Sequence, residues 1–137
     1  MRVILTMMKM TSDNNMLIKG IGSDIIEIER IQRSISSHGL KFLEKLFTEK
    51  EITYCQKHKH SHRHFAGRFA GKESIAKALG TGIGKKLEWK DIEILNNSEG
   101  KPEVFLSEKA YNLFDKPSIL LSISHCKSYA TATAICY

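Results

Sequence analysis

The spacing of apolar residues changes between the two halves of the 137-residue chain. In the first half, apolar side chains recur at the period of an amphipathic helix. In the second half, short β-branched runs are separated by clusters of Gly, Pro and Asn, which is typical of strands joined by turns. The sequence therefore predicts a single α+β domain, with N-terminal helices packed on an antiparallel sheet.

A short strand opens the predicted domain. Leu17–Asp24 combines apolar residues with Gly20 and Gly22, which either allow another backbone to approach closely or ease a bend. Isoleucines then recur at helical spacing, and Asp24 followed by Glu27 resembles a helix N-terminal cap. We therefore expect the first long helix to begin at Asp24 and to fade in the polar residues before Leu40.

Three more helices are expected before the sheet. Thr48 and Glu51 form a T-x-x-E capping box at the start of the second of them. The sequence GTGIG ends the third. The predicted ranges are Leu40–Leu46, Thr48–His58 and Phe65–Leu79.

Strands dominate the rest of the prediction. Asp91–Leu95 and Val104–Leu106 flank the turn cluster NNSEGKP, as in a hairpin. A short helix at Ser107–Phe114 begins with a Ser cap. The last two strands, Ile119–Ser124 and Tyr129–Ile135, are joined by the sequence HCKS.

Composition adds a basic surface to this picture. The formal net charge of +6 favours an acidic partner, but it does not choose among nucleic acid, membrane, protein and phosphorylated ligand. Three cysteines without a CxxC pair indicate free thiols in a cytoplasmic protein. No apolar run reaches the roughly 18 residues of a membrane span. Because the methionines all lie within residues 1–16, we interpret residues 1–15 either as a disordered leader or as sequence ahead of an alternative start at Met16, and residues 16–137 as the domain.

The last predicted helix of the first half and its glycine loop carry the first candidate site. Glu73 and Lys77 share a helix face, where an exposed ion pair is the simplest interpretation. The three glycines within Gly80–Gly84 exceed what a helix stop needs, and amides in such a loop can bind phosphate. Because this loop follows its helix, the helix dipole opposes an anion there, so lysines such as Lys77 must supply positive charge.

Two other positions carry groups of related chemistry. Asp24 is either the helix cap or a ligand for a hard metal, with Glu73 as its partner if the fold brings the two carboxylates together. His125, in the turn between the last two strands, is structural, a phosphate hydrogen-bond donor or a general base. Spacing along the chain leaves these alternatives open.

In combination and in this order, the motifs resemble holo-[acyl-carrier-protein] synthase, the small bacterial class of phosphopantetheinyl transferases. They are GIGSDIIEIERI, FTEKE, GRFAGKESIAKALGTGIG and SISHCKSYATA, at residues 20–31, 47–51, 67–84 and 122–132. WKDIEI and GKPEV are similar to the central strands of that family. The similarity extends from Leu17 to the C-terminus, which implies a phosphopantetheinyl transferase domain at residues 16–137.

The resemblance implies transfer of 4′-phosphopantetheine from coenzyme A to a serine of apo-acyl carrier protein, with release of adenosine 3′,5′-bisphosphate, in support of fatty acid biosynthesis. It makes Asp24, Glu73 and Lys77 catalytic: the carboxylates hold Mg²⁺ and Lys77 contacts the diphosphate. The resemblance does not decide whether the general base that deprotonates the serine is Glu73 or a hydroxide bound to the metal. The implied coenzyme A site is lined by Arg68, Lys77, Gly80, Thr81, Gly82, Ile83, Gly84 and His125.

Partners are implied by the same resemblance. Arg30 and Arg33, on the first long helix, would dock the acidic acyl carrier protein, which agrees with the basic composition. The alternative for both arginines is a solvated helix face. The resemblance also implies a homotrimer with active sites at subunit interfaces, with neither nucleic acid nor membrane insertion.

Two other classes of function compete with the transferase. A basic nucleic-acid-binding module accounts for the lysines but not for the ordered carboxylates, and the aromatic residues are not interleaved with a basic stripe. A histidine-rich metal-binding protein would use the KHKHSHRH segment, whose histidines form i,i+4 pairs suited to Zn²⁺ or Ni²⁺ if they lie on a helix. We favour a solvated connector for this segment. The pairs are His58 with His62 and His60 with His64.

Overall fold

The computed structural model describes residues 17–137, so the predicted leader at residues 1–15 lies outside the described residues. The predicted α+β class is confirmed. The helices are α2 (Ile28–Leu46), α3 (Glu49–Gln56), α4 (Ser61–Ala78) and α5 (Glu108–Leu113). The strands are β1 (Gly20–Glu27), β2 (Ile92–Asn96), β3 (Pro102–Leu106), β4 (Ile119–His125) and β5 (Tyr129–Cys136).

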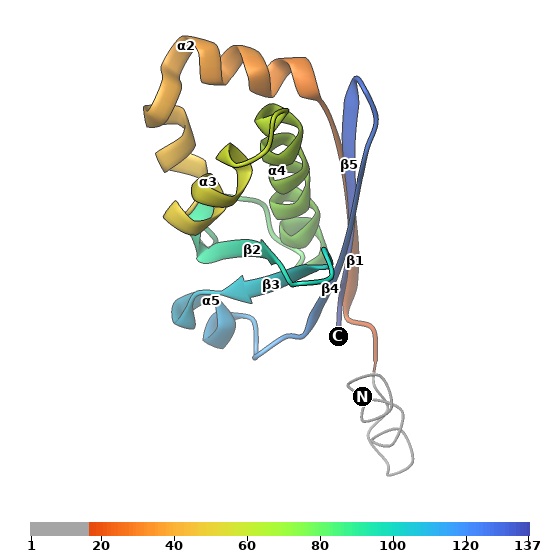
Figure 1. Cartoon of the computed structure of the whole chain (residues 1–137). Helices are drawn as coiled ribbons and strands as arrows, with labels where there is room; N and C mark the ends of the chain where they lie inside the picture. The colour runs from red at the N-terminus through yellow and green to blue at the C-terminus, as the bar shows by residue number, and fades with distance from the viewer. Residues whose placement is uncertain (1–16) are drawn as a thin grey trace.

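Helix α4 runs through the centre of the molecule, with a three-stranded sheet on one side and α2 and α3 on the other (Figure 1). The sheet has the antiparallel order β1–β5–β4, and β2 and β3 form a separate hairpin. Ala130, Ala132 and Ala134 of β5 are buried on the inner face of the sheet. Because these side chains are small, the helix can lie close to the sheet.

Strand β1 contacts α4 through its backbone. A Cβ atom added to Gly20 would lie 1.9 Å from the carbonyl oxygen of Ala78, and one added to Gly22 would lie 1.9 Å from the carbonyl oxygen of Ser74. Neither distance leaves room for a side chain. The two glycines therefore permit a close backbone approach, the first of the two roles predicted for them.

The start of α2 differs from the prediction. Strand β1 continues to Glu27, and Asp24 lies opposite Ala132 of β5, so the predicted helix cap at Asp24 is wrong. The isoleucines at this junction fit both the strand and the helix period, and pairing with β5 decides between the two. The two helices predicted on either side of Gly39 form one kinked helix, in which Gly39 has φ 56° and ψ −135°.

Helix α3 begins with the predicted capping box of Thr48 and Glu51. The Glu51 carboxylate has a second role, because it is buried and accepts hydrogen bonds from Lys72 Nζ at 2.7 Å and from the amide of Ile94 at 3.0 Å. Burial lowers the pKa of Lys72, and the charge of Glu51 opposes that shift. The three cysteines are unpaired, as predicted.

We expect Gly22→Ala to lower the free energy of unfolding by about 3 kcal/mol or more, because the new Cβ would collide with the Ser74 carbonyl and push β1 away from α4. Gly84→Ala is the control, since a Cβ there has no neighbour within 4 Å. Urea denaturation followed by circular dichroism measures both variants. A Gly22→Ala protein as stable as the control would contradict the close backbone contact.

Candidate active site

The contact between β1 and α4 brings together the three predicted catalytic residues. Lys77, in the last turn of α4, donates hydrogen bonds to Asp24 Oδ1 at 3.1 Å and to the carbonyl of Ser23 at 2.8 Å. Glu73 lies one helical turn earlier on the same face. Partial burial raises the pKa of Glu73, the nearby charge of Asp24 raises it further, and Lys77 opposes both effects.

The ion pair at this site is not the one that helical spacing suggests. Lys77 pairs with Asp24, because β1 lies against α4 and presents a carboxylate and a carbonyl to the lysine. Residues 17–137 contain no group of three or more His, Cys, Asp or Glu side chains arranged to hold a metal. Two neighbouring carboxylates nevertheless fit Mg²⁺, which takes one or two protein carboxylates and fills its other positions with phosphate and water.

The glycine loop follows directly after these residues. Gly80 has φ 77°, a left-handed conformation that ends α4. Gly80, Thr81 and Gly84 donate their amide hydrogens to carbonyls of the chain itself, at 2.8 to 3.1 Å. Within residues 17–137, the amides of Gly82 and Ile83 make no such hydrogen bond, so they are the candidates in this loop for binding phosphate.

Arg68 and His125 lie in a different place. They line a cavity of about 300 Å³ that is lined by none of Asp24, Glu73 and Lys77. Arg68 is only 3% exposed, and its guanidinium donates to the carbonyl of Ile94 at 3.1 Å and to Asn96 Oδ1 at 2.8 Å. The structure thus joins two predicted coenzyme A residues and separates them from the carboxylates.

Two other residues that line this cavity, Arg63 and His64, were not predicted to belong to the coenzyme A site, and His64 was considered only as a possible metal ligand. They belong to α4, which begins at Ser61 and not at the predicted Phe65, so part of the favoured solvated connector is helical. The imidazole of His64 stacks on His58 with ring centroids 3.8 Å apart, and its centroid is 5.9 Å from that of His125. The i,i+4 spacing of His64 and Arg68 was the sequence signal that could have placed His64 beside Arg68 in this cavity, because residues at that spacing share a helix face.

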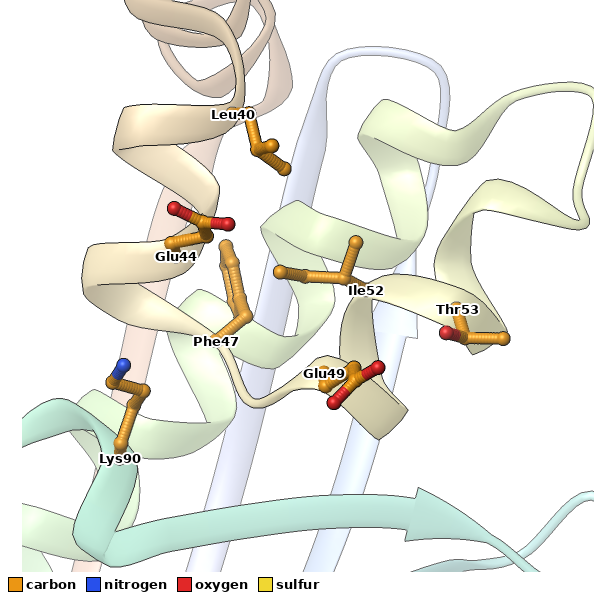
Figure 2. Close-up of a pocket in the computed structure, with 7 residues that line it drawn as sticks. All are labelled: Leu40, Glu44, Phe47, Glu49, Ile52, Thr53 and Lys90. Carbon is orange, nitrogen blue, oxygen red and sulfur yellow. The ribbon is translucent and has the colours of Figure 1, made fainter.

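A larger cavity, of about 410 Å³, lies between α2 and α3 (Figure 2). Leu40, Phe47 and Ile52 give it apolar walls, and Glu44, Glu49, Thr53 and Lys90 complete its lining. No predicted site residue contributes to it. Cavity size therefore does not locate the predicted chemistry in this molecule.

The two arginines predicted to dock a partner lie on the exposed face of α2. Arg33 donates a hydrogen bond from Nη2 to Glu29 Oε1 at 2.6 Å, and its side chain is 74% exposed. A solvated pair of this kind contributes little to stability. Both arginines are therefore accessible to a partner.

Comparison with known proteins identifies the class. The family model of the 4′-phosphopantetheinyl transferase superfamily matches residues 20–134. A holo-[acyl-carrier-protein] synthase from Protochlamydia amoebophila is 53% identical over 116 residues, which cover 85% of this chain and 95% of that protein. No helix within residues 17–137 combines the length and the apolar character that crossing a membrane requires.

Solved structures give the same result. The Helicobacter pylori holo-[acyl-carrier-protein] synthase in complex with coenzyme A has a TM-score of 0.79 and 36% identity, covering 85% of this chain and 99% of that one. The Bacillus anthracis enzyme in complex with CoA (3′,5′-ADP) has a TM-score of 0.76 and 40% identity, and the match covers 87% of this chain and 96% of that one. The chain belongs to the 4′-phosphopantetheinyl transferase superfamily and, within it, to the holo-[acyl-carrier-protein] synthases. The enzyme class predicted from the motifs is confirmed.

The folded protein should lose stability as the pH falls from about 6.5 towards 4. Burial, followed by the charges of His58, Arg68 and His125, lowers the pKa of His64 from 6.5 to about 4. In this window the unfolded chain binds a proton at His64 that the folded protein excludes, so protonation favours unfolding. We expect His64→Gln to flatten the decline.

Urea denaturation across this pH range measures the effect, and His38→Gln, which alters an exposed histidine of α2, is the matched control. Identical pH profiles for wild type and His64→Gln would contradict the assignment.

Proposed function

We propose that the protein transfers 4′-phosphopantetheine from coenzyme A to a serine hydroxyl of apo-acyl carrier protein, releasing adenosine 3′,5′-bisphosphate. The reaction depends on Mg²⁺ and serves fatty acid biosynthesis in the cytoplasm. The observation that carries the proposal is the convergence of Asp24, Glu73 and Lys77 at the contact between β1 and α4. Two related enzymes that were solved with coenzyme A or its fragment support the choice of donor.

The chemistry uses each of these groups. Attack of the serine oxygen on the phosphorus that bears pantetheine forms a new P–O bond and breaks the bridging P–O bond of the diphosphate. Negative charge develops on the 5′-phosphate of the departing adenosine 3′,5′-bisphosphate, and the serine proton passes to a general base, for which Glu73 is a candidate. Lys77 is half-exposed and lies beside both carboxylates, so its ammonium group can contact this charge as it develops. Asp24 and Glu73 would hold Mg²⁺, which when bound neutralises diphosphate charge. Arg30 and Arg33 would present positive charge to the acidic carrier.

Glu73→Gln and Asp24→Asn should each reduce kcat by at least about 100-fold, because each removes a charge that holds the metal near the developing diphosphate charge. Glu108→Gln, an exposed substitution on α5, is the control. The assay incubates each protein with apo-acyl carrier protein, coenzyme A and Mg²⁺, and mass spectrometry detects the phosphopantetheine on the carrier. The function would be refuted if wild type left a competent carrier unmodified. Near wild-type turnover in both carboxylate variants would refute the metal roles.

The placement of the two groups of site residues supports an active site shared between copies of the chain. Asp24 lies on β1 and His125 ends β4, and these strands are the two edges of one sheet. The outer face of the sheet exposes apolar side chains, including Ile21 at 68% and Ile25 at 65%. We infer that this face packs against other copies in a homotrimer, so that the carboxylates of one copy meet the cation-lined cavity of the next.

A mixture of two inactive variants tests this arrangement. Glu73→Gln damages one half of the site and His125→Ala the other, so each variant alone should be largely inactive. Refolding them together in equal amounts should restore about a quarter of wild-type activity, since one pairing in four combines two intact halves. Native mass spectrometry of the same samples gives the subunit number. A mixture as inactive as its components would mean that each copy holds a complete site.

A further inference from the structure

The four histidines of the KHKHSHRH segment form two pairs that helical spacing did not predict. Because α4 begins at Ser61, His58 lies in the turn before the helix and is not one helical turn from His62. His58 instead stacks on His64, with ring centroids 3.8 Å apart. The rings of His60 and His62 form the other pair, with centroids 6.0 Å apart and planes at 82°.

The geometry of the rings decides which pair can share a metal ion. An imidazole binds a metal through a nitrogen lone pair that lies in the plane of the ring, at about 2.0 to 2.1 Å. The planes of His58 and His64 differ by only 19°, so their lone pairs lie in nearly parallel planes and do not converge on one ion. The planes of His60 and His62 cross at nearly a right angle, which allows their lone pairs to meet.

The separation of His60 and His62 also suits one ion. Two imidazoles that bind the same ion at a tetrahedral angle hold their ring centroids about 5 Å apart, given metal–nitrogen distances of about 2.0 to 2.1 Å. The observed separation is 6.0 Å. Rotation of two side chains at the surface can close the remaining gap of about 1 Å without a change in the backbone.

Both rings have lone pairs that are not committed to an ion pair. Burial lowers the pKa of His62, and the neighbouring charges of His60 and Arg63 lower it further. The ring is therefore uncharged near neutral pH, which is the form that binds metals. Within residues 17–137, neither His60 nor His62 forms an ion pair with a carboxylate.

The surroundings favour a transition metal over a hard cation. His62 lines a cavity of about 350 Å³ in which two carboxylates, Glu27 and Glu29, face one cation, Lys127. The first turn of α4 contains no acidic residue, and the N-terminal end of the helix adds positive charge. The net negative charge is thus too small to hold Mg²⁺, which prefers oxygen ligands. Imidazole nitrogens suit Zn²⁺ instead.

We propose that His60 and His62 form a binding site for Zn²⁺, with water in the remaining coordination positions. The site is separate from the proposed Mg²⁺ site at Asp24 and Glu73, and it does not depend on the proposed function. Residues 17–137 contain no group of three ligands, so the ion is exchangeable and is not required for folding. A bound ion would join the turn before α4 to the first turn of the helix.

Isothermal titration of Zn²⁺ into the untagged full-length protein tests the proposal, with Mg²⁺ in excess so that the carboxylates Asp24 and Glu73 do not compete. His60→Gln and His62→Gln should each weaken Zn²⁺ binding by about 10-fold or more, because even the loss of an outer partner of a metal ligand has an effect of that size. Zn²⁺ should also raise the Tm of wild type and not that of either variant, since it binds the folded protein.

His58→Gln is the matched control, because it removes a histidine of the same segment whose ring cannot share an ion with its stacked neighbour. It should bind Zn²⁺ as wild type does. Equal weakening by His58→Gln would show that the segment binds metal without a defined pair, and would overturn the proposal. Wild-type affinity in both His60→Gln and His62→Gln, or a wild-type protein that does not bind Zn²⁺, would overturn it as well. Circular dichroism shows whether each variant is folded.

Discussion

The backbone contact between β1 and α4 is the constraint on which the proposed catalytic arrangement depends. Successive inward positions of the strand are Gly20, Gly22 and Asp24, because side chains alternate along a strand. The two glycines let the strand approach the helix without a side chain between them. The third inward position then places a carboxylate within 3.1 Å of Lys77 Nζ. Any residue larger than glycine in the first two positions would hold that carboxylate away from the helix.

A buried ion pair anchors α4 on its opposite face. Lys72 Nζ donates to Glu51 at 2.7 Å, to the carbonyl of Leu46 at 2.8 Å and to that of Trp89 at 3.0 Å, so its three donors are all satisfied. Such a pair contributes little net stability, since burying both charges is unfavourable, but it admits few alternative geometries. Lys72 directly precedes Glu73, so a fixed lysine on the inner face also fixes the direction in which Glu73 projects.

Local patterns predicted the parts of this structure that depend on neighbouring residues. The capping box at Thr48 is local, and so are the turn clusters between the strands. The position of Asp24 was predicted incorrectly, because pairing with β5, more than 100 residues away in the chain, extends the strand past it. Arg63 was missed for a related reason: its cavity is built from α3, α4, the β2–β3 hairpin and β4. No single segment of the sequence contains that information.

The two groups of site residues carry opposite charges, and this explains why one copy of the chain keeps them apart. If Arg63 or Arg68 lay beside Asp24 and Glu73, each guanidinium would pair with a carboxylate, and neither would remain free for a ligand. In this fold, Arg63 and Arg68 line a cavity to which neither Asp24 nor Glu73 contributes. The carboxylates thus keep the charge that a divalent ion requires, while the arginines keep the charge that an unassisted phosphate requires. The proposed ligand, with a diphosphate at one point and a phosphate monoester at another, matches this division, and in the proposed homotrimer the two groups would meet across an interface.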